Sequence, residues 1–381
     1  GNLTNALEVR YRLLKRGVGL TSTSDSEMIT QIIAAPAEVW SEGVPDEPSD
    51  DHWVNQIRAF MYMAEGAYSL ALLTRDGIYA VRDPLGLRPL CIGRLDDESG
   101  YVVASESCAL ATIGASYVRD VEPGEIVRLD AGGVTAFMGR PPTRSRAMCV
   151  FEYVYFARPD SLLDNQFIHD ARQNLGRQLA IEAPVDADIV IPVPDSATPA
   201  AIGYSLQSGI PFTEGLMKNR YIGRTFIQPD DSLRKQGVQL KFNALRHNLE
   251  GKRVVLVDDS IVRGNTCGPL VKLMRDNGAT EVHVRVSSPP VRHPCFMGVD
   301  MATYKELIAN RLDIDGICQH VGADSLDYLS LPGMLKAIGR GAKGGGYCTA
   351  CFSGEYPIEI PEWLLSEDRS KFLFEGQWSS A

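Results

Sequence analysis

The stretch RVVLVDDSIVRGNT, residues 253–266, decides the fold of this chain. Its first five residues form a short β-branched run that predicts a buried strand. Residues 266–277 carry apolar side chains at helical spacing and end before Gly278, as a helix with a glycine C-cap does. The stretch therefore predicts a strand, a loop of small residues and a helix in direct succession.

Strands and helices are expected to alternate on both sides of this unit. The sequence predicts helices at 171–181 and 198–207, and strands at 187–193, near Phe212 and at 282–287. Alternating β and α units favour an α/β fold, with a parallel sheet that has helices on both faces.

Two adjacent carboxylates, Asp258 and Asp259, stand where the predicted strand ends. In an open parallel sheet, ligands bind just beyond the carboxyl ends of the strands, and a loop leading into a helix N-terminus holds phosphate with its free N–H groups. Ser260 and Gly264 allow the backbone to approach a ligand closely. Because carboxylates suit ribose hydroxyls or a hydrated Mg²⁺, the stretch predicts a sugar-phosphate site with magnesium. A strand followed by an ordinary acidic turn is the alternative for the Asp pair alone.

The composition narrows the class of protein. The chain has 381 residues, of which 44% are hydrophobic and 23% charged, and it has room for two domains. No apolar run is long enough to span a bilayer, and a net charge of −10 argues against nucleic-acid binding. Eight cysteines are too few for a disulfide framework in a chain of this length, and there is no signal peptide, so a cytoplasmic setting is expected.

One segment, residues 218–241, is basic within this acidic chain. Its cations outnumber its two acidic residues, Asp230 and Asp231; they are Lys218, Arg220, Arg224, Arg234, Lys235 and Lys241. Such a patch suits a polyanionic small molecule, and a solvated surface loop is the alternative.

The motifs taken together resemble those of a known family. DDSIVRGNT resembles the phosphoribosyl-pyrophosphate (PRPP) signature of type I phosphoribosyltransferases, in the form found in glutamine PRPP amidotransferases. Four further segments resemble that family in the same order: FEYVYFARPD at 151–160, VPDSATPAA at 193–201, KNRYIGRTFIQP at 218–229 and GVDMATYKELIAN at 298–310. The likeness extends from about residue 1 to residue 354.

The resemblance implies a fold and a division into domains. A partial glutaminase domain of the Ntn-hydrolase type, with αββα layers, is expected at 1–146. A type I phosphoribosyltransferase domain is expected at 147–330, and a tail that carries cluster ligands at 331–381. The Gly- and Lys-rich part of this tail, 333–346, is expected to be mobile.

The resemblance also assigns roles in the transferase half. Mg²⁺ would be held by Ser196, Asp258 and Asp259, and Lys241 matches a position associated with nucleotide inhibitors. The flexible loop that closes over the substrate would carry Lys218, Arg220, Tyr221 and Arg224. PRPP would be bound by Asp258, Asp259, Ser260, Arg263, Gly264, Asn265 and Thr266. An ordinary surface lysine is the alternative for Lys241.

The first residues resemble the glutamine site of the same family. GNLTN at residue 1 and SDSE at 24–27 imply that Gly1 belongs to an Asn-Gly oxyanion pair and that Asp25 binds the α-amino group of glutamine. In this family an N-terminal Cys attacks glutamine. The nearest cysteine here, Cys91, lies well inside the chain, so the sequence predicts no catalytic nucleophile and a polypeptide that uses ammonia only.

Four cysteines fall where the iron–sulfur form of the family has its cluster ligands: Cys149, Cys295, Cys348 and Cys351. The last two form a CxxC pair. Four thiolates in this pattern suit a [4Fe-4S] cluster or zinc, and the resemblance favours a structural cluster. Cys91, Cys108, Cys267 and Cys318 are expected to be plain buried thiols.

The resulting prediction is a magnesium-dependent enzyme of the first committed step of purine synthesis. PRPP and ammonia from glutamine would give 5-phosphoribosylamine and pyrophosphate, with purine nucleotides as inhibitors and a homotetramer as the assembly. Two alternatives stay open: a PRPP-binding regulator without transferase activity, and a salvage transferase that attaches a base to PRPP.

Overall fold

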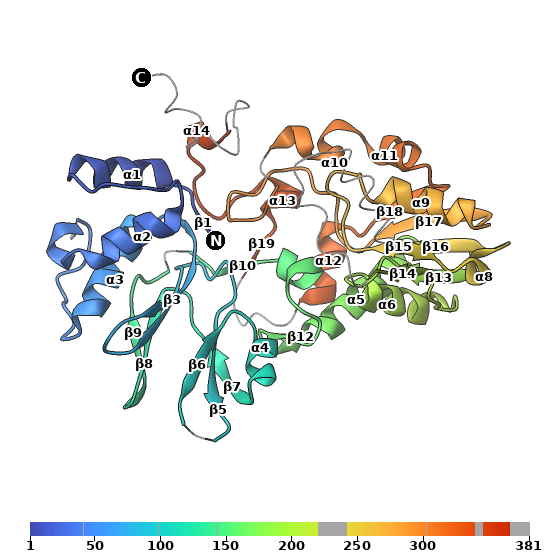
Figure 1. Ribbon diagram of the computed structural model, residues 1–381. Coiled ribbons are helices and arrows are strands. Elements are labelled where there is room, and N and C mark those ends of the chain that lie inside the picture. The colour runs from blue at the N-terminus through green and yellow to red at the C-terminus, as the bar shows by residue number, and fades with distance from the viewer. Residues whose placement is uncertain are drawn as a thin grey trace.

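A four-stranded parallel sheet, with the strand order β13-β16-β17-β18, forms the centre of the C-terminal half (Figure 1). The computed structural model describes residues 1–40, 42–97, 99–142, 144–219, 242–301, 303–339 and 346–365. The strands are β13 (Ile189–Pro192), β16 (Arg253–Asp258), β17 (Glu281–Val286) and β18 (Ser325–Tyr328). The predicted parallel sheet is thereby confirmed.

Helices cover both faces of this sheet because its strands are apolar on both sides. In β16, Val255 and Val257 face a core with α5 (Ile168–Glu182), α6 (Thr198–Ser208) and α12 (Leu331–Ile338). Val254 and Leu256 face the opposite core, with α9 (Cys267–Asp276) and α11 (Ile314–Val321). Successive side chains of a strand point to opposite faces, so a continuous β-branched run fills two cores.

Two expectations for this half need correction. The strand predicted near Phe212 is only a single bridge between Phe212 and Val190. The mobile segment predicted at 333–346 begins instead within α12, whose N-cap Ser330 accepts a hydrogen bond from the Gly333 N–H and whose Met334 and Ile338 are buried. Packing against the sheet therefore stabilises this end of the segment, and residues 340–345 lie outside the described residues.

Two glycines let α5 and α6 approach closely. A Cβ atom on Gly176 of α5 would lie 1.8 Å from the carbonyl oxygen of Ala200, and one on Gly203 of α6 would lie 1.9 Å from the carbonyl oxygen of Gln173. Both obstacles are main-chain atoms of the facing helix. The absence of a side chain at these two positions sets the separation of the helices.

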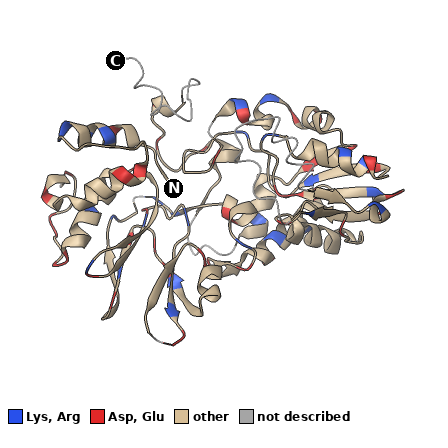
Figure 2. Ribbon diagram, viewed as in Figure 1, with Lys and Arg blue, Asp and Glu red and all other residues tan. Residues whose placement is uncertain are grey.

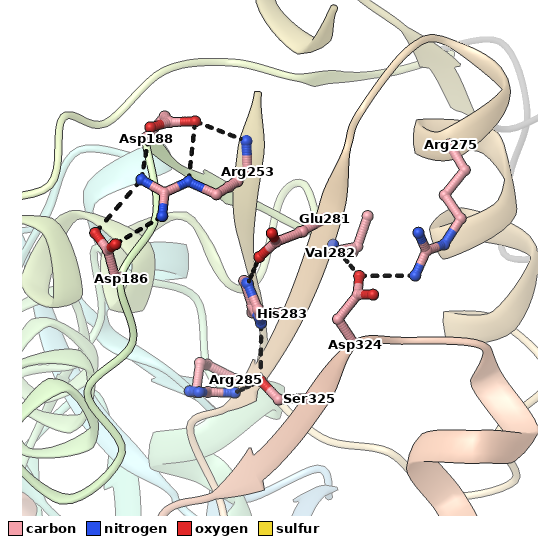
Figure 3. Close-up of polar contacts among 10 residues, drawn as sticks. All are labelled: Asp186, Asp188, Arg253, Arg275, Glu281, Val282, His283, Arg285, Asp324 and Ser325. Carbon is pink, nitrogen blue, oxygen red and sulfur yellow. Dashed lines mark hydrogen bonds and ion pairs between the residues drawn. The ribbon is translucent and has the colours of Figure 1, made fainter. Parts of the chain in front are cut away.

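Ion pairs hold the opposite, amino-terminal edge of the sheet (Figure 3). Arg253 at the start of β16 donates to Asp186, with an Nη1–Oδ2 distance of 2.6 Å, and to Asp188 at 3.0 Å. In β17, the two ring nitrogens of His283 lie 2.9 Å from a Glu281 carboxylate oxygen and 3.0 Å from the Ser325 hydroxyl. These polar groups satisfy one another at this edge of the sheet.

The N-terminal half is built in layers. A helical layer of α1 (Ala6–Lys15), α2 (Asp25–Ala34) and α3 (His52–Met63) covers an antiparallel sheet of order β3-β4-β8-β9. The strands of this sheet are β3 (Ser69–Leu73), β4 (Ile78–Arg82), β8 (Glu125–Asp130) and β9 (Gly133–Met138).

A second antiparallel sheet, of order β6-β5-β7, packs on the first through a core that includes Ala80, Ile92 and Val127. It consists of β5 (Cys91–Leu95), β6 (Tyr101–Ala104) and β7 (Ala115–Asp120), and the short helix α4 (Ser107–Thr112) covers its other side. This order of layers agrees with the predicted αββα arrangement.

Several contacts join the two halves. Strand β10 (Ala147–Cys149) pairs in parallel with β19 (Gly346–Cys348), and both lie between the halves (Figure 1). Arg88 of the first half forms a 3.0 Å ion pair with the buried Glu152. Chain segments far apart in sequence therefore meet at this junction.

Basic and acidic residues are interspersed along the elements of both halves (Figure 2). Within the described residues, no helix is both long and apolar enough to cross a membrane.

Candidate functional site

The carboxyl ends of β13 and β16 bring the predicted magnesium residues together. Pro192 is paired with Val257, so the chain leaves both strands at the same level of the sheet. Ser196, in the turn after β13, forms a side-chain hydrogen bond with Asp259. Two segments separated by some sixty residues therefore meet because the strands are parallel neighbours.

Asp258 and Asp259 are buried, with 7% and 5% of their surface exposed. The Asp259 N–H donates to Asp258 Oδ1 at 2.9 Å, and the Ser260 hydroxyl donates to Asp259 Oδ1 at 2.7 Å. Burial raises the pKa of Asp259, whereas the hydroxyls of Ser196 and Ser260 and the positive charge of Arg172 act to lower it. A bound cation would offset the cost of keeping these carboxylates ionised, so the donor set suits Mg²⁺.

The loop after Asp259 leads into the N-terminus of α9. Gly264 has a φ of +79°, a left-handed conformation that favours glycine. Thr266, the N-cap residue, makes no side-chain capping hydrogen bond. The first N–H groups of α9 therefore have no capping oxygen from Thr266, and a phosphate can take that place.

Arg263, a predicted PRPP residue, is held by the segment that follows β17. Its Nε donates to Glu306 Oε2 at 3.0 Å, and its Nη2 donates to the carbonyl oxygen of Asp300 at 3.3 Å. Glu306 also accepts a 3.0 Å hydrogen bond from the Thr303 hydroxyl. These contacts tie the GVDMATYKELIAN motif to the loop beside the predicted phosphate site.

The loop and the strand ends open into a cavity of about 290 Å³. The predicted residues Ser196, Asp258, Asp259, Ser260, Arg263, Gly264, Asn265 and Thr266 all line it. Phe151, Tyr155 and Phe156 form a second wall, which we call the aromatic wall. The sequence motif FEYVYFARPD contains these rings, but nothing in their spacing assigned them to the cavity.

The predicted flexible loop begins and ends beside the cavity. Strands β14 (Leu216–Lys218) and β15 (Phe242–Ala244) pair Lys218 with Phe242, which lines the cavity. Lys218 forms an ion pair with Asp195. The other loop residues, Arg220, Tyr221 and Arg224, and the predicted inhibitor residue Lys241 lie outside the described residues.

Gly1 lies within electrostatic reach of Asp25 and against a segment of the transferase half. Burial lowers the pKa of the Gly1 amino group, and the negative charge of Asp25 acts in the opposite direction. The Asn2 amide donates to the carbonyl oxygen of Phe296 at 2.9 Å, and a Cβ atom on Gly298 would lie 2.6 Å from the Gly1 oxygen. Gly1 and its neighbour Asn2 thus contact the segment that leads to the cavity wall.

The four cysteines of the predicted cluster meet at the junction of the halves. Cys149 and Cys348 are directly paired in β10 and β19, and the Cys295 sulfur accepts a hydrogen bond from the Met297 N–H at 3.3 Å. Burial, together with the charges of Cys348 and Cys295, raises the pKa of Cys149 to about 12 against the opposing charge of Arg88. Burial and the charge of Cys295 raise the pKa of Cys348 to about 11.

Burial also raises the pKa of Cys351, and the negative charges of Cys149, Cys295 and Cys348 raise it in the same direction. Across the described part of the chain, however, no three His, Cys, Asp or Glu side chains converge on a site for one metal ion. Of the remaining thiols, Cys91, Cys108 and Cys267 are buried as expected, and Cys318 is half-buried.

Comparisons with known proteins agree with these observations. Residues 1–112 match the family model described as "Glutamine amidotransferase domain". The human amidophosphoribosyltransferase is 47% identical over 402 residues, with 95% of this chain and 76% of the relative covered, and the Drosophila melanogaster enzyme is 50% identical, with 96% and 70% covered.

Solved structures give the same result. Glutamine PRPP amidotransferase from B. subtilis, complexed with ADP and GMP, superposes with a TM-score of 0.83 at 45% identity, covering 95% of this chain and 76% of that chain. A structure described as the allosteric regulatory enzyme of purine biosynthesis superposes with a TM-score of 0.84 at 45% identity, with 95% and 75% covered. The chain therefore belongs to the amidophosphoribosyltransferase family, pentosyltransferase enzymes of purine biosynthesis.

Proposed function

We propose that the cavity at the carboxyl edge of the sheet binds PRPP with Mg²⁺ and transfers its phosphoribosyl group to ammonia derived from glutamine. The products would be 5-phosphoribosylamine and pyrophosphate, in the first committed step of purine synthesis. One observation carries the proposal: Ser196 and the buried Asp258–Asp259 pair share a cavity with a phosphate-type loop at a helix N-terminus. PRPP needs carboxylates that bind its ribose and its metal ion, and N–H groups that bind its phosphate.

Each group has a part in this reaction. Backbone N–H groups of the loop from Ser260 to Thr266 would hold the 5′-phosphate, while Asp258, Asp259 and Ser196 would hold the magnesium. When bound, Mg²⁺ neutralises charge on the departing pyrophosphate. Positive charge develops on the ribose ring as the C1–O bond breaks, and the aromatic wall would keep water from that carbon. No protein nucleophile is required.

We also propose roles for segments of the chain that do not line the cavity. We assign the glutaminase-type domain to 1–146, the transferase domain to 147–330 and the tail to 331–381. Lys218, Arg220, Tyr221 and Arg224 would close over PRPP, and Lys241 would contact a nucleotide inhibitor, in keeping with the ADP and GMP bound to the B. subtilis relative. A cytoplasmic homotetramer is the assembly that we propose.

The test is release of pyrophosphate from PRPP by the purified chain. We expect release that depends on both Mg²⁺ and ammonium chloride, because ammonia can enter the cavity from solution. An added purine or pyrimidine base should not replace ammonia. If PRPP binds with Mg²⁺ but no pyrophosphate appears with ammonia, the chain is a regulator rather than a transferase.

We also propose that Cys149, Cys295, Cys348 and Cys351 hold a structural [4Fe-4S] cluster. The fit rests on four half-buried thiols that lie near enough to act on one another electrostatically. A cube of iron and sulfide is larger than one zinc ion, so its thiolates stand further apart. When bound, the cluster would tie β10, β19 and the segment around Cys295 together.

Replacing Cys348 by Ser is expected to destabilise the protein more than it weakens PRPP binding. The lost thiolate would loosen the junction between the halves, whereas the Asp258–Asp259 loop keeps its own contacts. Thermal unfolding and a PRPP titration measure the two effects, and Cys318→Ser is the matched control outside the cluster. Equimolar iron and acid-labile sulfide are expected in the wild-type protein; stoichiometric zinc without sulfide would contradict the cluster.

A further inference from the structure

Arg172 lies in α5, behind the aromatic wall, and is only 2% exposed. Its guanidinium donates three hydrogen bonds to main-chain carbonyl oxygens. Nε donates to Tyr153 at 2.8 Å, and Nη2 donates to Ala157 at 2.8 Å and to Glu152 at 3.4 Å. All three carbonyls belong to one short segment.

That segment is the one-turn π-helix η2 (Glu152–Phe156) with its C-cap Ala157. A helix this short satisfies few of its own carbonyls, and here the Ala157 N–H donates to the Glu152 oxygen at 3.2 Å. Tyr155 and Phe156 project from the same turn into the cavity lining. The hydrogen bonds from Arg172 therefore hold the backbone that carries the aromatic wall.

A residue from the first half of the chain also holds η2. Arg88 forms the 3.0 Å ion pair with Glu152, and its guanidinium lies 4.9 Å from the centre of the Phe156 ring. Two cations therefore hold this turn: Arg88 through side chains and Arg172 through main-chain carbonyls. The charge of Arg172 also acts on Asp259.

We propose that Arg172 is a positioning residue for phosphoribosyl transfer, which keeps the aromatic wall closed so that ammonia rather than water reaches the sugar. This inference rests on the transferase activity proposed above. It concerns the choice between two reactions: ammonia attack gives phosphoribosylamine and pyrophosphate, whereas water attack at C1 breaks the same C1–O bond and gives ribose 5-phosphate and pyrophosphate. Arg172 would touch neither PRPP nor the metal.

A lysine cannot replace Arg172 in this role. The planar guanidinium has five N–H donors in a fixed fork, whereas a lysine has one nitrogen on a flexible stem. Arg172→Lys keeps the positive charge and can still bind one or two carbonyls, so the fold should survive. A single nitrogen, however, cannot reach all three carbonyls in the geometry that the guanidinium fork provides, so the turn would be held less firmly.

The experiment compares wild-type protein with Arg172→Lys and, as a control on the same helix, Arg177→Lys. Arg177 is half-buried and donates to Asn174 at 2.9 Å, away from the cavity. Initial rates of pyrophosphate release are measured with and without ammonium chloride, and hydrogen exchange is followed in residues 150–158. Circular dichroism checks folding, and Arg172→Gln provides a second, uncharged variant.

We expect Arg172→Lys to raise the ratio of ammonia-independent to ammonia-dependent pyrophosphate release by about tenfold, with faster exchange in residues 150–158, since small misplacements of a reactive site cost on the order of 10²-fold in rate. Arg177→Lys should behave as wild type. A wild-type protein without ammonia-dependent release would instead refute the proposed function. Two results would overturn the inference and show that Arg172 serves stability alone. One is an unchanged ratio in a folded Arg172→Lys; the other is unfolding of both Arg172 variants while Arg177→Lys stays folded.

Discussion

Asp259→Asn is expected to reduce ammonia-dependent pyrophosphate release by about 10²–10³-fold. Asn is close to Asp in size and keeps one oxygen to accept from Ser260, so the loop should fold. It cannot supply the negative charge that a divalent cation requires at this buried position. Initial rates over a series of Mg²⁺ concentrations measure the effect, and we expect half-maximal activity to need far more Mg²⁺.

The matched control is Asp276→Asn at the other end of α9. Asp276 forms an exposed ion pair with Lys272, one turn earlier, with a distance of 2.7 Å. Such a pair contributes about 0.3–0.5 kcal/mol to a helix and nothing to the cavity. Asp276→Asn should therefore keep full activity. Near-normal rates and Mg²⁺ dependence in Asp259→Asn would exclude Asp259 as a metal-binding residue.

Gly176→Ala is expected to lower the free energy of unfolding by at least about 3 kcal/mol. The new methyl group would lie 1.8 Å from the Ala200 carbonyl oxygen, and this oxygen belongs to the main chain of α6. No rotation of a side chain can relieve the contact, so α5 and α6 would have to separate. Chemical denaturation followed by circular dichroism measures the loss.

Gly268→Ala tests whether any added methyl group in a helix has this effect. Gly268 lies in α9, and a Cβ atom on it would have the Cα of Val321 as its nearest neighbour, 3.7 Å away. An alanine fits there, and it should stabilise the helix by about 0.5–1 kcal/mol because it restricts the unfolded chain. Equal stabilities of Gly176→Ala and Gly268→Ala would contradict the close packing of α5 and α6.

Local sequence was sufficient for the central strand–loop–helix unit. The β-branched run 253–257 became β16, and the helix expected from residue 266 became α9, with Thr266 as its N-cap. Their patterns are strong because a strand buried on both faces has no polar positions and a surface helix repeats its apolar positions every turn. The strand near Phe212 failed because a short apolar stretch forms a strand only where a neighbour continues the pairing, and here the pairing stops at one bridge.

Contacts between distant segments decided the rest. The carboxylates Asp258 and Asp259 could be read as a ligand site from their place after a strand, because every parallel sheet gathers such positions at one edge. The aromatic wall and Arg172 could not, since their roles depend on the path by which η2 and α5 pack beside that edge. A residue's neighbours along the chain determine its strand or helix; its partners across the fold determine whether it lines a cavity, holds a backbone turn or fills a core.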